Sequence, residues 1–459
     1  MRVKDFYFDT QTYLDRRHDL STALTSGKIL LLGNNHDPRN YTDNTHPYRQ
    51  DSSFLYYAGI NRAGLALTID VDAQKTILYG DDPDLDEVIW TGPQTSLHTL
   101  ADRAGIDEVQ PWSTLQLSSR DSVHHLQPYK HAHMRLLSSW GLSSHSLDLT
   151  RAIIAQRSIK TEEEMVLMDA AVSASNAMHR RVMAAIREGM TEHALVAEAY
   201  KVAWEHGCQM AYQPIMTVDG QTLHNHHYHN VLKEGDMVLY DGGVEHPSGY
   251  CGDITRTTPV SRSFTSLQRA LYEIVLKAYN EAVRLTRPGV TFKSIHLAAA
   301  TQLVQGLKEL GWMKGDVDEA VADGAHSLFF QCGLGHMIGL DVHDMENLGE
   351  QYVGYESPGD KSTDFGLKSL RLGKALQEGY ALTIEPGLYI IPELIDRCRS
   401  EGRHAQFVNY EEVEKHKDFG GIRVEDNFVI TQNGNRRLGD ELALTTSDVE
   451  AAKLRKAAT

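Results

Sequence analysis

Apolar and polar residues alternate along this chain with two periods, one typical of strands and one typical of helices. Two short apolar runs of strand length, Lys28–Leu32 and Leu65–Ile69, occur in the first third and are separated by helical and loop segments. No glycine-rich loop that would cradle a phosphate lies among them. We therefore expect residues 1–155 to form a small α/β unit.

Longer helices are expected after residue 160. Thr161 and Glu164 have the spacing of a capping box, which predicts the start of a long helix that ends near Gly189. A second helix is expected from Thr191 to about Glu205.

The same arrangement returns further along the chain. A helix is expected to begin at Thr265 and to stop before Pro288, and its partner begins at Thr291. Two rounds of paired helices and strands indicate an internal pseudo-repeat and an α+β fold for residues 156–445. Residues 446–459 follow as a C-terminal tail.

Two aspartates flank a predicted hairpin. Val238–Gly243 and Val244–Thr257 are expected to form strands around a Pro-Ser-Gly turn, and Asp241 and Asp253 lie equally far from its centre at Pro247. This places them opposite each other, with Cβ atoms about 5 Å apart. Like charges this close are costly when buried, so such a site must hold a proton or a cation. A solvated hairpin with two surface aspartates is the alternative.

Two glutamates interrupt apolar strands. Glu385 lies within Ala381–Ile390, and Glu425 within Gly421–Ile430, where the period of two puts Arg423 on the same face as Glu425. An acid and a cation on an apolar strand indicate a buried charged network. A simple Arg-Glu ion pair is the alternative for the second strand.

Imidazoles come from a glycine-rich segment, Gly333–Asp344, which contains His336 and His343. A single histidine on an apolar strand is more often a core residue than a ligand. Here two occur within eight positions, among glycines that allow backbone or substrate to approach closely.

The four carboxylates and one imidazole could hold two divalent metal ions. The ligands would be Asp241, Asp253, His336, Glu385 and Glu425. Oxygen ligands with a single nitrogen suit Mn²⁺, with Zn²⁺ and Co²⁺ as alternatives. Two ions roughly 3.5 to 4 Å apart can share a water, lower its pKa and polarise a carbonyl group, so the expected nucleophile is a metal-bridging hydroxide.

The segments that carry these residues form a set: Asp241–Gly243, Gly252–Arg256, Gly333–His336, Gly339–Asp344, Ile384–Gly387 and Gly421–Asp426. Together they resemble the pita-bread metallopeptidases, in particular the Xaa-Pro branch with prolidase (Xaa-Pro dipeptidase) and aminopeptidase P. The resemblance covers nearly the whole chain, and Tyr48–Gly59 resembles the N-terminal domain of these peptidases. It implies a pita-bread catalytic domain at residues 156–445, which follows a smaller N-terminal domain in the sequence.

The resemblance also implies a role for each ligand. Asp241 would chelate one metal ion, His336 and Glu385 the second, and Asp253 and Glu425 would bridge both. Glu385 would be the general base, which takes a proton from water and later delivers it to the departing proline nitrogen.

By the same resemblance, His343 and His224 would donate hydrogen bonds to the substrate carbonyl or the oxyanion, where a lost donor typically costs about 10²- to 10³-fold in rate. The neighbours of His224 allow another interpretation, because His226, His227 and His229 could form an adventitious metal-binding cluster.

One position departs from the family pattern. Many relatives have a further histidine four residues before the metal-binding one, where this chain has Cys332. The change removes a donor near the substrate and predicts altered specificity or slower turnover. The alternative is that Cys332 is a buried, inert thiol.

Two features favour a dipeptidase over an aminopeptidase. The 40 positions from Glu385 to Glu425 contain an insertion that resembles the prolidases. Arg371 aligns with the prolidase arginine that binds the dipeptide carboxylate, and Arg423 is the second expected substrate-binding residue. Against this, the segments around Tyr48 and His336 also resemble bacterial aminopeptidase P.

Two other classes of function remain as alternatives. A pita-bread binding protein without catalysis would generally have lost metal ligands, and all five are present here. A creatinase-like amidinohydrolase would need acids that recognise a guanidinium group.

Composition sets the remaining expectations. Forty-five basic and 62 acidic residues give a formal charge of −17, which disfavours nucleic acids and anionic membranes as partners. The expected partners are peptides with proline at the second position and further copies of this chain, in a homodimer or homotetramer. Four scattered cysteines and the lack of an apolar secretion core or spanning segment predict a cytoplasmic protein with reduced thiols.

Overall fold

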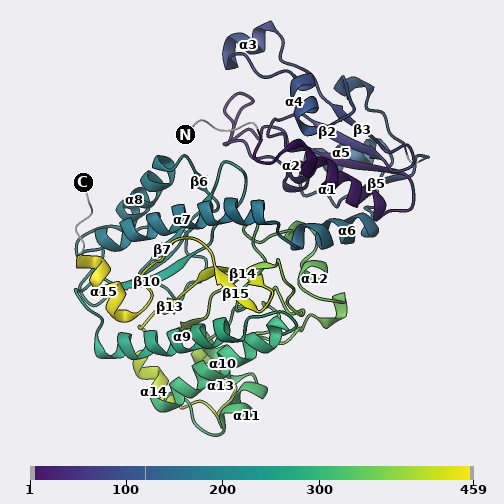
Figure 1. Ribbon diagram of the computed structural model, residues 1–459. Helices are drawn as coiled ribbons and strands as arrows, with labels where there is room; N and C mark the ends of the chain where they lie inside the picture. Colours follow the sequence, from purple (N-terminus) through teal and green to yellow (C-terminus); the bar gives the residue numbers. More distant parts are fainter. Residues whose placement is uncertain (1–5, 119, 455–459) are drawn as a thin grey trace. The chain divides into compact units, whose positions relative to one another are not determined.

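The computed structural model describes residues 6–118 and 120–454 (Figure 1). The chain separates into two compact units between Arg157 and Ser158. Nowhere in the described ranges is a helix both long enough and apolar enough to cross a membrane.

A mixed sheet with the strand order β4-β3-β2-β1-β5 forms the centre of the N-terminal unit. Strands β1 (Lys28–Leu32) and β2 (Ala66–Asp70) pair antiparallel, with Leu30 opposite Thr68, so both predicted strands are confirmed. The other elements are α1 (Thr10–Thr22), α2 (Ser52–Ala58), β3 (Lys75–Tyr79), α3 (Leu85–Thr91), α4 (Leu97–Ala104), β4 (Glu108–Gln110), β5 (Val123–His125), α5 (His131–Ser139) and α6 (Leu147–Ser158).

Two pairs of long helices dominate the C-terminal unit, and their starts agree with the prediction. Helix α7 (Glu162–Ala185) begins after Thr161, whose hydroxyl accepts the Glu164 amide while the Glu164 carboxylate accepts the Thr161 amide. This capping box satisfies two amide groups that the first helical turn leaves without partners. The helix ends four residues before Gly189. The other three helices are α8 (Glu192–Glu205), α9 (Ser266–Leu285) and α10 (Phe292–Glu309), each with a threonine N-cap.

The element order repeats within this unit. Helices α7 and α8 are followed by the antiparallel sheet β10-β8-β7, and α9 and α10 by the antiparallel sheet β11-β14-β15. Figure 1 shows the strands between the two helix pairs. Apolar side chains such as Met178, Leu195 and Val238 pack α7 and α8 onto the first sheet. The expected pseudo-repeat of paired helices and strands is therefore present in the structure.

The strands of this unit are short. They are β6 (Gln209–Met210), β7 (Ile215–Thr217), β8 (Met237–Asp241), β9 (Val244–Glu245), β10 (Thr255–Pro259), β11 (Ala381–Ile384), β12 (Gly387–Tyr389), β13 (Gly421–Arg423), β14 (Asp426–Thr431) and β15 (Gly434–Arg437). The shorter helices are α11 (Val317–Ala322), α12 (Glu350–Val353), α13 (Pro392–Ser400), α14 (Tyr410–Val413) and α15 (Thr446–Leu454), with a 3-10 turn, η2, at Ala325–Leu328.

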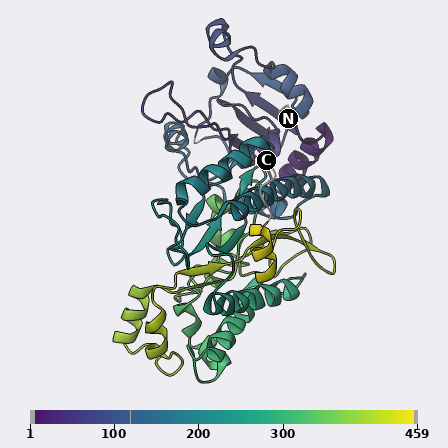
Figure 2. The ribbon, with the colours of Figure 1, turned by 90° about the vertical axis from the view of Figure 1, so that its left-hand side faces the viewer.

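The insertion between β12 and β13 forms helices α13 and α14. Its Val408 pairs with Met313, just beyond α10, and the Lys314 amide donates to the Phe407 carbonyl. Figure 2 shows the insertion beside α10 and α11, at one end of the unit.

The segment predicted as a C-terminal tail contains helix α15. Val449 is buried, and Glu450 accepts hydrogen bonds from the Arg269 guanidinium and the Phe264 amide. Residues 446–454 are thus packed on the C-terminal unit, and the last five residues lie outside the described ranges.

Two buried histidines in this unit predict acid sensitivity. Burial lowers the pKa of His296, in α10, to about 3, and the nearby His326 adds to the effect. Burial, with His404 second, lowers the pKa of His326 to about 4. Both pKa values lie below the unfolded value of about 6.5, so this stabilisation is complete above pH 6.5 and is lost as the pH falls toward 4.

Replacing His296 by leucine should therefore reduce the stability difference between pH 7 and pH 5 by about 2 kcal/mol. Urea unfolding at the two pH values measures this difference, and any constant cost of the substitution cancels. The exposed His98→Leu serves as the control. If the free energy of unfolding fell equally from pH 7 to pH 5 in His296→Leu and in the parent protein, the prediction would be contradicted.

Candidate metal centre

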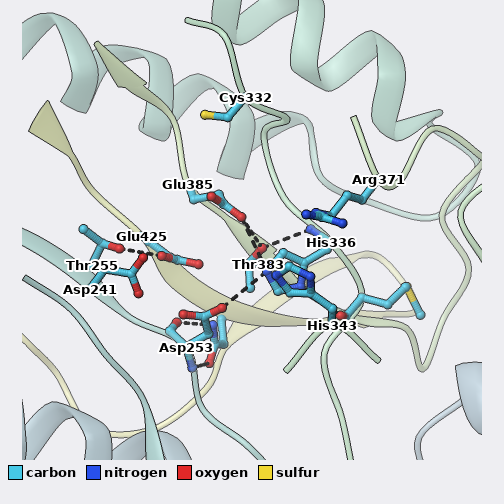
Figure 3. Close-up of polar contacts among 12 residues, drawn as sticks. Asp241, Asp253, Thr255, Cys332, His336, His343, Arg371, Thr383, Glu385 and Glu425 are labelled. Carbon is cyan, nitrogen blue, oxygen red and sulfur yellow. Dashed lines mark hydrogen bonds and ion pairs between the residues drawn. The ribbon is translucent and has the colours of Figure 1, made fainter. Parts of the chain in front are cut away.

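Five side chains from strand ends and neighbouring loops point toward one space in the C-terminal unit (Figure 3). They are the five predicted ligands, Asp241, Asp253, His336, Glu385 and Glu425. All but Glu385 are at least nine-tenths buried. Ligand atoms of Asp253, His336 and Glu425 already lie within 4.8 Å of one another. The His336 Nε2 atom is 3.3 Å from Asp253 Oδ2 and 3.5 Å from Glu385 Oε1.

The predicted hairpin of the two aspartates forms, but its register differs from the expectation. Asp241 lies opposite Thr255, and the turn is closed by a hydrogen bond from the His246 amide to the Tyr250 carbonyl. Its centre is thus Ser248, one residue later than Pro247, which makes Asp241 and Asp253 diagonal rather than direct neighbours. Because side chains alternate with a period of two, both still lie on one face.

The two predicted glutamate strands are each broken at the acid. Glu385 separates β11 from β12, and Glu425 separates β13 from β14. In both cases the chain passes from one sheet to another, because β11 pairs with β14 while β12 pairs with β13. The prediction of continuous strands was therefore wrong, and the breaks turn both carboxylates toward the aspartates.

The segment with His336 is irregular rather than a strand. It runs beside β11, where the Thr383 amide donates to the His336 carbonyl and the His336 amide donates to the Thr383 hydroxyl. A Cβ atom at Gly335 would lie 2.1 Å from the Thr383 carbonyl oxygen, so only glycine permits this approach. His336 thus lies on an irregular segment that is held against β11, with a β-bridge between Met337 and Leu382.

The charges of the centre are unbalanced without a cation. Burial, then the neighbouring carboxylates, raises the pKa of Glu425 well above its ordinary value, and burial raises the pKa of Glu385 to about 7. Burial opposes protonation of His336, but Asp253 and Glu385 outweigh it and raise its pKa to about 9. A metal ion would replace these protons and remove the repulsion. The oxygen-rich donor set with one imidazole fits divalent metal ions.

Sequence reasoning missed Tyr212 and Asn427. The Tyr212 hydroxyl oxygen lies 2.5 Å from Asp241 Oδ1 and also contacts Asp253 Oδ1, so its single proton is shared between the two aspartates. The Asn427 side chain accepts from the Asp253 amide and donates to the Asp253 carbonyl, as a neighbouring strand would. No local pattern distinguishes either residue, and only the folded chain brings them to the site.

The predicted arginine on β13 pairs with an aspartate. Arg423 is buried and contacts Asp241 Oδ2 and the Tyr389 hydroxyl. Burial raises the pKa of Asp241 despite this positive charge. The buried charged network is present, and its ion pair joins Arg423 to Asp241 instead of forming the simple Arg-Glu pair considered as the alternative.

The predicted donors and Arg371 lie around the centre. The His343 ring is 4.0 Å from the His336 ring, and its Nδ1 atom is 3.0 Å from Glu346 Oε2. Glu346 also accepts from Arg371 at 2.7 Å, so the three side chains form a chain of contacts. His224 is partly desolvated although it remains accessible, and this desolvation, followed by the charges of Arg423 and Arg371, lowers its pKa.

Cys332 lies beside Glu385 in Figure 3. Its thiol contacts the Tyr389 hydroxyl at 3.8 Å. Burial, followed by the charge of Glu385, raises its pKa to about 12. The thiol therefore stays protonated at neutral pH, which supports the interpretation of an inert cysteine.

Comparison with known proteins finds two matching family models. Residues 166–432 match metallopeptidase family M24, and residues 13–126 match the aminopeptidase P N-terminal domain. The Xaa-Pro aminopeptidase of Escherichia coli is 31% identical, over 96% of this chain and 97% of its own length. The human Xaa-Pro dipeptidase is 30% identical, over 90% of this chain and 86% of its own length.

A solved structure extends the match to three dimensions. Zinc-substituted E. coli aminopeptidase P, in complex with product, superimposes with a TM-score of 0.79 and 28% identity, covering 98% of this chain and 100% of that one. These matches confirm the resemblance and the α+β fold, with a smaller N-terminal and a larger C-terminal part.

Proposed function

Because the chain belongs to metallopeptidase family M24, we propose that it hydrolyses the peptide bond that precedes a proline at the second position. The chain is a metallopeptidase, and the bond that it cleaves is inferred from the names of its relatives. The proposed partners are accordingly small Xaa-Pro peptides, and the proposed assembly is a homodimer or homotetramer.

The five converging side chains, four of them buried, support a pair of divalent ions, with Mn²⁺ as our first choice and Zn²⁺ and Co²⁺ as alternatives. Such ions would polarise the scissile carbonyl and activate a water. We propose that Asp253 and Glu425 lie between the two positions, with Asp241 on one side and His336 and Glu385 on the other. The repulsion among these carboxylates supports the assignment, because each would gain from a shared cation.

The protein's own groups would move the proton and bind the substrate. Glu385, whose carboxylate accepts a hydrogen bond from Thr383 at 3.2 Å, would take a proton from water and return it to the proline nitrogen. His343 and His224 would donate to the carbonyl oxygen as its negative charge develops. Arg423 would keep Asp241 charged and in place.

The contacts of Arg371 carry our proposal for peptide length. Its guanidinium lies 2.7 Å from Glu346 and 3.5 Å from Glu350, so two carboxylates already balance its charge. Because Glu350 also pairs with Lys361, these side chains already form a balanced group. A dipeptide carboxylate would have to displace a glutamate from Arg371, whereas a longer peptide would bring a neutral amide that needs no such exchange. We therefore place the Xaa-Pro aminopeptidase first.

The dipeptidase is the second candidate, and one contact favours it. Arg371 is linked to His343 through Glu346, which keeps a guanidinium near the proposed carbonyl donor. If the guanidinium exchanged Glu350 for the proline carboxylate, it would bind a dipeptide by paired hydrogen bonds.

Peptide length should separate these candidates. With Mn²⁺-loaded protein, we expect kcat/KM for Ala-Pro-Ala to exceed that for Ala-Pro by about 10-fold or more, which corresponds to the displacement of one ion pair. Arg371→Ala should then change both substrates alike. Hydrolysis of Ala-Pro alone, with a rise in KM for that dipeptide in Arg371→Ala, would establish the dipeptidase instead. Cleavage of neither peptide would contradict the proposed function.

A further inference from the structure

Three exposed histidines from two elements gather beside the start of α8. His193 lies in the first turn of this helix, and His227 and His229 lie in the loop between β7 and β8. The ring centroids of His193 and His229 are 5.6 Å apart, and those of His227 and His229 are 6.0 Å apart. Within the described residues, no hydrogen bond or ion pair occupies a ring nitrogen of these three side chains. The imidazoles are therefore available as ligands.

The loop backbone is fixed to the helix that carries His193. Glu192 is fully buried, and its carboxylate accepts from the Val218 amide at 2.9 Å and from the Asn230 amide at 3.0 Å. A bridge between Thr191 and Val231 adds a second connection. Because of these contacts, the three histidines are held near one another by the fold and not by the local sequence.

Tyr228 separates the two loop histidines and points elsewhere. Its hydroxyl donates to the Pro214 carbonyl at 2.6 Å, and its ring packs edge-on against His193. The rings of His227 and His229 nevertheless lie near each other and are nearly parallel, with an interplanar angle of 20°.

The spacing of the rings is close to that of a metal site. With Zn–N bonds of about 2.0 Å, two imidazoles on one tetrahedral ion have ring centroids about 5 Å apart. The observed separations exceed this value by about 1 Å, which a rotation of exposed side chains about χ1 and χ2 can cover. Among the described residues, only Asp253, His336 and Glu425 already converge within 4.8 Å, so the surface site would close around its ion.

We propose that His193, His227 and His229 form a third metal site, which binds one borderline divalent ion such as Zn²⁺, Ni²⁺ or Cu²⁺. Three nitrogen ligands distinguish it from the carboxylate-rich centre, because imidazole favours these ions over Mn²⁺. Water would fill the remaining positions. The site does not depend on the proposed peptidase function.

Titration of the Mn²⁺-loaded protein with Ni²⁺, followed by calorimetry, tests this site. We expect one nickel-binding event that His227→Ala/His229→Ala abolishes and that His193→Ala weakens at least ~10-fold, because each change removes a nitrogen ligand. His226→Ala is the matched control, since this exposed histidine belongs to the same loop but takes no part in the ring contacts that join His193, His227 and His229. Circular dichroism verifies that each variant is folded.

The variants also define the contrary results. If His193→Ala bound Ni²⁺ as tightly as the parent protein, the three-ligand site would be overturned. The ion would then be bound only adventitiously, by the loop histidines. An equal loss in His226→Ala, or nickel binding that the double variant retains, would place the ion elsewhere. Neither result would bear on the hydrolysis of Xaa-Pro peptides.

Discussion

Replacing Asp253 by alanine is expected to abolish binding of the metal pair and to reduce kcat/KM by at least ~10³-fold, because this carboxylate lies between the other ligands. It is 3.3 Å from His336 and shares Tyr212 with Asp241. Glu425→Ala should have the same effect, since Glu425 converges on the same point. Without either carboxylate, the remaining ligands would hold two cations with too little negative charge.

Elemental analysis of the purified variants measures the metal content directly. Glu281→Ala is a suitable control, because this glutamate pairs with Arg284 on the surface of α9 and should leave two ions per chain. Retention of two ions by Asp253→Ala or Glu425→Ala would refute the assignment of bridging ligands, even if activity were lost.

Asp426→Ala is expected to destabilise the C-terminal unit by about 3 to 5 kcal/mol, because it leaves a buried charge without its partner. The guanidinium of Arg256 is fully buried and donates to both Asp426 oxygens, at 2.9 and 3.1 Å. The Tyr279 hydroxyl donates to the same carboxylate at 2.6 Å and would also lose its acceptor.

Urea unfolding in the presence of a chelator measures this effect without a contribution from bound metal. Arg437→Ala should change stability by less than about 1 kcal/mol, since this partly exposed arginine is 3.9 Å from Asp426. The double variant Arg256→Leu/Asp426→Leu should lose less stability than Asp426→Ala, because it leaves no unpaired charge. If the single and double variants were equally destabilised, lost packing rather than the charge would be the cause.

The chemistry of the centre could be predicted from the sequence because acids on apolar strands are conspicuous. Glu385 and Glu425 stand where core residues are expected, and the resemblance of their surroundings to a known family gave each a role. The starts of the long helices were also predicted correctly, since a capping box such as that of Thr161 and Glu164 acts within one helical turn.

The errors arose where distant segments compete for the same backbone groups. The hairpin register depends on a turn centred at Ser248, and the breaks at Glu385 and Glu425 arise because the flanking strands pair in different sheets. Periodicity describes one strand at a time and contains no information about its partners.

The sequence by itself determined the long helices, the five proposed ligand residues and the family of this protein, because these follow from local patterns and motifs. Only the tertiary structure decided which side chains meet: Arg423 with Asp241 across 182 positions, Tyr212 with both aspartates, and His193 with the loop of His229. The physical reason is that such contacts depend on how helices and sheets pack, and packing is a property of the whole fold rather than of any segment.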